Sequence, residues 1–257
     1  MRKLLFFDVD GTLYNSDKKL PQSAKEAIFA ARANGYEIAI ATGRAPFMIQ
    51  AILEELDIDT YVTFNGQYVV YKGEVIFTDG IPNEQLKEII AFGEMHNHPV
   101  VFLDEERMIA AVGEDSRIGE SLATLRYPYP QIDASYYEQK SVYQTLLYIT
   151  EDEQPLYEET FPHVSFVRWH PYSCDMLPRG GSKARGIEKL LAHCGGTMQD
   201  VYAFGDGLND IEMLQAVGCG VAMGNSHTEV KPVADVIIGH VDEDGLAKGM
   251  RQLGLIK

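Results

Sequence analysis

The chain has 257 residues, of which 46% are apolar and 23% are charged, and this ordinary composition excludes disordered, fibrous and low-complexity proteins. The length leaves room for one or two domains with a hydrophobic core. Because 38 acidic residues outnumber 22 basic ones, the net charge of −16 would repel nucleic acids and anionic membrane surfaces, so neither is expected as a partner.

The N-terminal third predicts strands that alternate with helices. Short, continuous apolar runs are typical of strands that are covered on both faces. Between them, residues 22–34 place Ala24, Ala27, Ile28 and Ala31 on one helical face. We expect strands at residues 3–9, 36–41, 61–64, 67–71 and 74–78, and helices at residues 22–34 and 47–55.

The C-terminal third repeats this pattern, whereas the middle of the chain does not. Residues 82–181 contain alternating apolar and polar segments, a stretch rich in tyrosine and proline, and acidic connectors. We therefore expect a doubly wound α/β core with a mostly parallel sheet, formed by residues 1–81 and 182–257, and an inserted α+β domain at residues 82–181. The C-terminal helices are expected at residues 183–193 and 210–216, near Thr228 and at residues 245–253, and the strands at residues 201–204, 220–222 and 236–238.

Two carboxylates directly follow the first predicted strand. Asp8 and Asp10 belong to the segment Asp8-Val9-Asp10-Gly11-Thr12, and open α/β sheets bind ligands at the carboxyl ends of their strands. An Asp-x-Asp-Gly segment alone is also an ordinary turn after a strand. It is not an EF-hand calcium loop, because the fifth position is Thr12 and the twelfth is Lys19.

Three further polar motifs follow predicted strands or begin predicted helices. They are Thr42-Gly43-Arg44, the lysine of Gly180-Gly181-Ser182-Lys183, and Gly205-Asp206-Gly207-Leu208-Asn209-Asp210. Taken singly, each can be a helix cap or an exposed side chain. Because the carboxyl ends of parallel strands meet at one edge of a sheet, we expect all four motifs to converge there.

In this order the four motifs resemble those of the haloacid dehalogenase-like hydrolase superfamily. The insertion between the second and third motifs resembles the Cof-type phosphatase branch, which has a type IIB cap, and the resemblance covers nearly the whole chain. The segment Ala222-Met223-Gly224-Asn225-Ser226 is also similar to a loop of that branch. The sequence departs from the pattern at Ala184, where many relatives have glycine, and at residues 175–178, where the branch often has Glu-Ile.

The resemblance implies a magnesium-dependent phosphatase that hydrolyses a small phosphorylated metabolite through an aspartyl-phosphate. The metabolite could be a sugar phosphate, a nucleotide or a cofactor phosphate. Asp8 is then the nucleophile, and Asp10 is the acid that protonates the leaving oxygen and later the base for water. The implied magnesium ligands are Asp8, the main-chain carbonyl of Asp10, Asp206 and Asp210, and the implied phosphate donors are Thr42, the Gly43 amide, Lys183 and Asn209.

Several alternatives stay open. A phosphomutase or phosphotransferase would use the same aspartyl-phosphate, and a phosphate-ligand sensor would keep the pocket without turnover. Arg44 could bind phosphate, reach the inserted domain or pair with a neighbouring acid, and Asn65-Gly66 could border the pocket or form only a turn. His96 and His98 are expected to be surface or capping residues, because the sequence offers no third zinc ligand nearby.

The expected location is the cytoplasm. The three cysteines Cys174, Cys194 and Cys219 are odd in number and lack a Cys-x-x-Cys pair, which is typical of reduced thiols. The apolar run at the N-terminus is too short for a signal peptide, and no run approaches the roughly 20 residues of a membrane span. The sequence indicates no oligomeric state.

Overall fold

The computed structural model describes residues 3–257, and these form two compact units. The first unit holds the described residues up to Arg44, Met48–Thr78 and Ser182–Lys257, and the second holds Ala45–Phe47 and Asp79–Gly181. The chain is thus an α/β protein with an inserted α+β unit, which confirms the predicted fold class. No helix among the described residues is long and apolar enough to cross a membrane.

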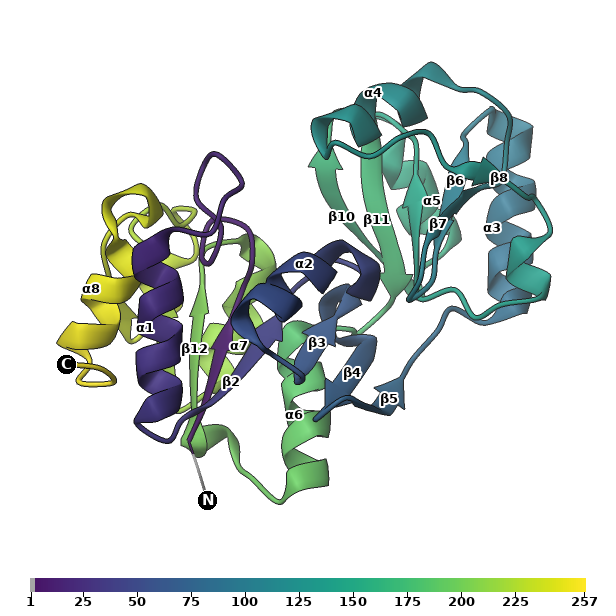
Figure 1. Cartoon of the computed structure of the whole chain (residues 1–257). Helices are drawn as coiled ribbons and strands as arrows, with labels where there is room; N and C mark the ends of the chain where they lie inside the picture. The colour runs from purple at the N-terminus through teal and green to yellow at the C-terminus, as the bar shows by residue number, and fades with distance from the viewer. Residues whose placement is uncertain (1–2) are drawn as a thin grey trace. The chain divides into compact units, whose positions relative to one another are not determined.

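The first unit is built on an eight-stranded sheet with the order β14-β13-β12-β1-β2-β3-β4-β5. Figure 1 labels β12, β2, β3, β4 and β5 of this sheet. In this order the strands from β14 to β3 are parallel, and β3, β4 and β5 pair antiparallel. Their bounds are β1 Leu4–Phe7, β2 Glu37–Ala41, β3 Tyr61–Thr63, β4 Tyr68–Tyr71, β5 Glu74–Thr78, β12 Val201–Gly205, β13 Cys219–Ala222 and β14 Val236–Ile237.

Strand β1 shows why this sheet is covered on both faces. All four of its residues are buried. Leu5 and Phe7 pack into one hydrophobic cluster with residues of α1, α2 and α8, while Leu4 and Phe6 pack into a second cluster with residues of α6 and α7. Successive side chains of a strand point to opposite faces, so an uninterrupted apolar run serves two cores at once. The helices are α1 Gln22–Ala33, α2 Pro46–Leu56, α6 Lys183–Cys194, α7 Ile211–Ala216 and α8 Gly245–Gln252.

One predicted element is wrong. In place of a helix near Thr228, the chain makes successive turns that end in a short 3-10 helix at Lys231–Val233. The amides of Val230 and Val233 donate to carbonyls three residues earlier, and Pro232 has no N–H with which to continue an α-helical ladder.

The second unit contains a six-stranded sheet with the order β10-β11-β9-β6-β7-β8. Its strands pair antiparallel except β7 with β8. Helices α3 and α5 supply Leu86, Ile89 and Tyr157 to its hydrophobic cluster, and α4 begins at a cap in which the Asp115 side chain accepts from the Arg117 amide. The elements are β6 Val100–Leu103, β7 Met108–Ala110, β8 Gln131–Ile132, β9 Gln144–Leu147, β10 Val164–His170, β11 Ser173–Pro178, α3 Asn83–His96, α4 Ser116–Thr124 and α5 Gln154–Thr160.

Candidate active site

The polar motifs of the first unit gather at the carboxyl edge of its sheet. Asp8 follows β1, Thr42 follows β2 and Asp206 follows β12, and β1 pairs in parallel with both β2 and β12. Asp8 is 7% exposed, and its amide donates to the carbonyl of Phe204 at 2.9 Å. The parallel register therefore brings residues from the two ends of the chain to one place.

Lys183 joins two of the carboxylates. Its Nζ donates to Asp8 Oδ1 and to Asp210 Oδ1, at 2.6 Å in each case. The side chain is completely buried, although residues 180–183 taken alone favoured an exposed lysine at the start of α6. Burial by itself would lower the pKa of Lys183, but the carboxylates of Asp210 and Asp8 raise it above its usual value. Lys183 is therefore an ammonium ion in the site.

Asp8, Asp206 and Asp210 form an acidic cluster, in which one oxygen of each lies within 4.8 Å of the others. Burial, with repulsion from the neighbouring aspartates, raises the pKa of Asp8 to about 8 and that of Asp206 to about 6. Three carboxylates face one ammonium, so the cluster leaves negative charge that a cation would balance. Oxygen-only ligands suit a magnesium ion, and a divalent cation would lower these pKa values again.

Other groups fix the orientation of the acidic cluster. Asp206 accepts from Thr12 Oγ1 at 3.2 Å and from Asn225 Nδ2 at 3.3 Å. Asp210 Oδ2 accepts from the amides of Asp206 and Gly207 at 2.9 Å, so its Oδ1 is left for Lys183. Neighbouring donors thus hold Asp206 at both carboxylate oxygens and Asp210 at Oδ2, which keeps these oxygens of the cluster in place.

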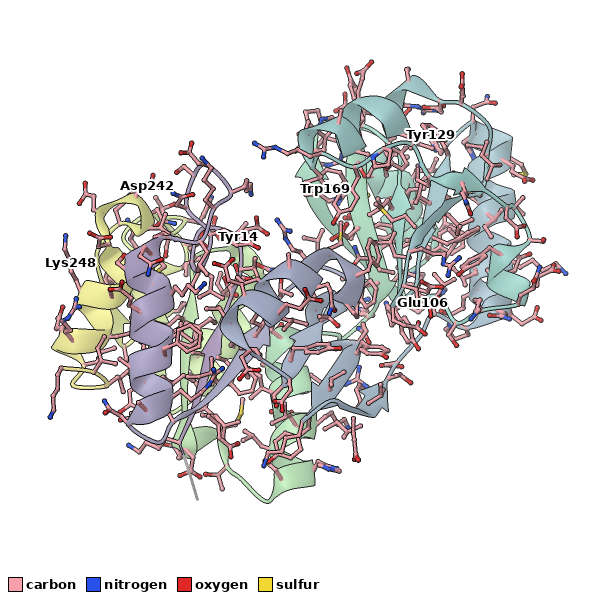
Figure 2. All side chains as sticks on the ribbon, viewed as in Figure 1. Tyr14, Glu106, Tyr129, Trp169, Asp242 and Lys248 are labelled. Atoms are coloured by element: carbon pink, nitrogen blue, oxygen red, sulfur yellow. The ribbon has the colours of Figure 1, made fainter. Side chains whose placement is uncertain are left out.

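Asp10 lies apart from this cluster in its hydrogen bonding. Arg44 donates two hydrogen bonds to the Asp10 carboxylate, from Nε to Oδ2 at 2.6 Å and from Nη2 to Oδ1 at 2.8 Å. Lys18 Nζ also donates to Oδ1, at 2.7 Å. Burial would raise the pKa of Asp10, but the hydrogen bonds and charges of Arg44 and Lys18 lower it. Of the alternatives for Arg44, the structure shows pairing with a neighbouring acid, and its guanidinium also lies 5.8 Å from the ring centre of Tyr14, which Figure 2 labels.

The remaining predicted residues line the same edge of the sheet. Thr42 is 2% exposed, and its Oγ1 accepts from the Arg44 amide at 3.2 Å. Asn209 is exposed, and its Nδ2 donates to Asn65 Oδ1 at 2.9 Å. A methyl group on Gly43 would approach the Asn209 carboxamide to 3.4 Å. Binding of phosphate by these groups, and of a cation by the Asp10 carbonyl, stays a prediction.

Sequence reasoning missed several partners of the site. Lys18 sits in the loop after β1 and has no pattern that would single it out, and Thr12 and Asn225 were noted only within longer segments. Of the two histidines expected at the surface or in a cap, His96 is exposed at the end of α3, and its Nδ1 contacts the carbonyl of Phe92. The expectation is wrong for His98, which is 8% exposed because its ring lies between Tyr157 and Glu153, with Nδ1 2.9 Å from the Tyr157 hydroxyl.

Comparisons with known proteins agree with this geometry. A model of the haloacid dehalogenase-like hydrolase family matches residues 5–250. Over 255 residues the chain is 42% identical to YkrA of Bacillus subtilis (strain 168), which is provisionally named a phosphatase, and 99% of each chain is covered. It is 30% identical to the pyridoxal phosphate phosphatase YbhA of Escherichia coli (strain K12), with 96% of each chain covered.

Solved structures show the same likeness. A hypothetical protein from Geobacillus kaustophilus HTA426 superposes with a TM-score of 0.96 at 47% identity, over the full length of both chains. BT4131, described as a sugar phosphatase of subclass IIB of the superfamily, superposes with a TM-score of 0.86 at 36% identity, covering 99% of this chain and 100% of its own.

Proposed function

Because the chain belongs to the haloacid dehalogenase-like hydrolase family and its relatives at 42% and 30% identity are named as phosphatases, we propose that this phosphatase hydrolyses the phosphate monoester of a small metabolite through an aspartyl-phosphate on Asp8. The observation that carries the proposal is the position of Asp8. Its carboxylate lies at the sheet edge, 2.6 Å from the ammonium of Lys183 and within the acidic cluster of Asp206 and Asp210.

In the first step an oxygen of Asp8 attacks phosphorus, and the bond between phosphorus and the ester oxygen breaks. Asp10 gives its proton to the leaving oxygen, so the metabolite departs as an alcohol. The ion pair with Lys183 favours the ionised Asp8 that this attack requires, against the burial that favours the protonated form. Splitting a difficult displacement into two easier ones is the advantage of a covalent intermediate.

In the second step water attacks the phosphorus of the aspartyl-phosphate while Asp10 accepts its proton. The bond between phosphorus and the Asp8 oxygen breaks, orthophosphate leaves, and the Asp8 carboxylate is restored. Arg44 and Lys18 lower the pKa of Asp10, which favours the carboxylate that acts as the base in this step. The same two cations disfavour the protonated acid of the first step, so that step draws on a minor protonated population at neutral pH.

We assign magnesium to Asp8, Asp206 and Asp210, with the main-chain carbonyl of Asp10. The three carboxylates supply the oxygen ligands that magnesium prefers. When bound, the ion neutralises negative charge and helps to orient the phosphoryl group. Thr42, the Gly43 amide, Lys183 and Asn209 are the proposed donors to the phosphoryl oxygens, which carry the charge of the transition state.

The substrate is a small phosphorylated metabolite, and residues 82–181 are the proposed cap that selects its leaving group. The names of the two relatives, a pyridoxal phosphate phosphatase and a sugar phosphatase, support sugar and cofactor phosphates as the first compounds to test. We propose a cytoplasmic location, which the three free cysteines support.

The proposal is tested by phosphate release from an aryl phosphate and from a panel of phosphorylated metabolites, with magnesium and with EDTA. Asp8→Asn is expected to lower kcat at least about 1,000-fold, because the amide cannot form the acyl-phosphate. Circular dichroism should show an unchanged fold, and Asp17→Asn in the exposed part of the same loop is the matched control.

The outcome separates the remaining functions. Wild-type turnover by Asp8→Asn would exclude Asp8 as the nucleophile. Phosphorylated sugar in place of orthophosphate, when an acceptor sugar is added, would identify a phosphotransferase. A shift in melting temperature with a phosphorylated compound, without release of phosphate by the wild type, would identify a sensor.

A further inference from the structure

The turn after β3 has an unusual backbone. Phe64 and Asn65 have φ values of 50° and 51°, and Gly66 has a φ of 97°. Three successive residues therefore lie in the left-handed region, which asparagine and glycine tolerate and a bulky aromatic residue does not favour. Such conformations persist only where the surroundings hold them, and they concentrate at functional sites.

Contacts on two sides hold this turn. The Phe64 amide donates to the carbonyl of Arg44, and the Asn65 amide donates to the carbonyl of Thr42, both at 3.1 Å. On the other side Gly66 lies against the start of α6, where an added Cβ would come within 2.0 Å of the carbonyl oxygen of Ser182. The turn therefore fits between the Thr42–Arg44 loop and the helix that carries Lys183.

The side chain of Asn65 occupies the space beside Gly43. It is 5% exposed, and a Cβ on Gly43 would lie 3.0 Å from its Nδ2 and 3.1 Å from its Oδ1. The same Oδ1 accepts from Asn209 Nδ2 at 2.9 Å. Glycine at position 43 thus leaves room for the Asn65 carboxamide, which reaches Asn209, a residue 144 positions away in the sequence.

We propose that Asn65 is a positioning residue of the phosphate pocket, which fixes the carboxamide of Asn209. By accepting a hydrogen bond from one N–H of Asn209 Nδ2, Asn65 Oδ1 prevents the Asn209 carboxamide from flipping. The second N–H of Nδ2 is then left for a phosphoryl oxygen. The inference rests on the proposed function, in which Asn209 donates to phosphate. A strained turn whose buried side chain joins β3 to the β12 motif is the observation that carries it.

The competing explanation is that asparagine stands at position 65 only because it tolerates the left-handed backbone. Asn65→Gly separates the two explanations, since glycine keeps this conformation and removes only the carboxamide. Asn97→Gly is a matched control: Asn97 also has a left-handed backbone, with φ 58° and ψ 39°, and it caps α3 in the second unit.

The experiment measures kcat/KM for the best ester and the Kd of orthophosphate by calorimetry in the presence of magnesium. Asn65→Gly is expected to lower kcat/KM and to raise the Kd of orthophosphate, each by roughly 10–100-fold, which is the range for loss of a hydrogen bond to a charged group. Asn97→Gly should leave both within about twofold, and the melting temperature of Asn65→Gly should stay within about 2 °C of the wild type.

A double variant shows whether Asn65 acts through Asn209. If it does, Asn65→Gly combined with Asn209→Ala should lose no more than Asn209→Ala alone. Wild-type values for Asn65→Gly, or losses that multiply in the double variant, would overturn the inference. If the wild type releases no phosphate from any ester, the proposed function fails, while the orthophosphate Kd still tests Asn65; absence of orthophosphate binding by the wild type would overturn both.

Discussion

The two units bury aspartate in different ways. In the second unit Asp104 is 1% exposed, and its Oδ1 accepts from the amides of Glu106 and Arg107 in its own turn. In the first unit Asp8 is 7% exposed, and its charged partner is Lys183, 175 residues away. Asp104 bonds to its own turn and, through Oδ2, to the hydroxyl of Tyr136 in the same unit, whereas Asp8 belongs to a group of charges assembled from both ends of the chain.

This difference distinguishes structural from functional burial of charge. An aspartate bonded to the amides of its own turn stabilises that turn at little cost. Burial and repulsion from neighbouring aspartates raise the pKa values of Asp8 and Asp206, so these two carboxylates oppose folding when ionised, and raised pKa values of this kind concentrate at functional sites. Substitutions in the acidic cluster should therefore change activity more than stability, and substitutions in the second unit should do the reverse.

Among the substitutions that test this comparison, the largest effect is expected from Asp206→Asn, which removes one carboxylate of the acidic cluster. Phosphate release at limiting magnesium should fall at least about 100-fold, because several kcal/mol of charge stabilisation are weakened. The variant should be as stable as the wild type or more stable in EDTA at pH 8, since burial raises the pKa of Asp206 to about 6. The measurement is a magnesium titration of activity, with Asp57→Asn, whose side chain is 92% exposed, as the control. Unchanged magnesium activation would refute the assignment of this cluster.

Unlike substitutions in the acidic cluster, Lys183→Met should also lower the stability of the fold, because it leaves Asp8 and Asp210 without their ammonium partner. Removing one partner of a buried ion pair costs about 3–5 kcal/mol. The loss should grow as the pH rises, because ionised Asp8 is the form that the ammonium of Lys183 stabilises, and it is measured by urea unfolding in EDTA. Lys189→Met, at an exposed position of the same helix, should change stability by less than about 0.5 kcal/mol. Equal stability of the two variants would show that the ion pairs contribute nothing to folding.

Asp175 in β11 tests the second unit by its pH dependence. Burial raises the pKa of Asp175 to about 7 from an ordinary value of 3.8. The folded chain therefore binds a proton that the unfolded chain releases between these values, and stability falls as the pH rises through this interval. Asp175→Asn should exceed the wild type by on the order of 2 kcal/mol at pH 8, and the gap should narrow towards pH 4. The measurement is the melting temperature of both proteins between pH 4 and pH 8. A difference in stability between Asp175→Asn and the wild type that does not vary with pH would contradict the raised pKa of Asp175.

The smallest effect is expected from Tyr157→Phe. Tyr157 is completely buried, and its hydroxyl lies 2.9 Å from His98 Nδ1. Loss of this hydrogen bond should cost about 1 kcal/mol in urea unfolding and leave phosphate release unchanged. Tyr172→Phe, at a residue that is 38% exposed, is the control. A loss of activity in Tyr157→Phe with no loss of stability would reverse the comparison between the units.

The parallel part of the first sheet could be predicted because each of its strands is recognisable from its own residues. Residues such as Leu4–Phe7 form an uninterrupted apolar run, and motifs that follow such runs must meet at one edge of the sheet. In the second unit, short antiparallel strands such as Met108–Ala110 carry too few residues for a clear pattern. The turns at residues 227–233 share their composition with a short helix, and only the hydrogen bonds distinguish them.

Parts of the site could not be predicted, because they depend on tertiary contacts. Nothing near Lys183 in the sequence indicates complete burial, which follows from Asp8 and Asp210 meeting its ammonium in the folded chain. Lys18 reaches Asp10 from a turn whose left-handed backbone, with φ 59°, has no asparagine or glycine to mark it.

The separation of the site residues along the chain also determines when each of them appears during synthesis. Asp8 precedes Lys183 by 175 residues, and Thr12 precedes Asp206 by 194. At about 5–20 residues added per second, the proposed nucleophile Asp8 emerges from the ribosome roughly 10–40 s before Lys183 and before the other aspartates of the acidic cluster. During that interval β1, which lies between β2 and β12 in the finished sheet, has only one of its neighbours. In the proposed mechanism, a nascent chain therefore carries an aspartate that cannot yet accept phosphate, and turnover requires that residue 210 has left the ribosome.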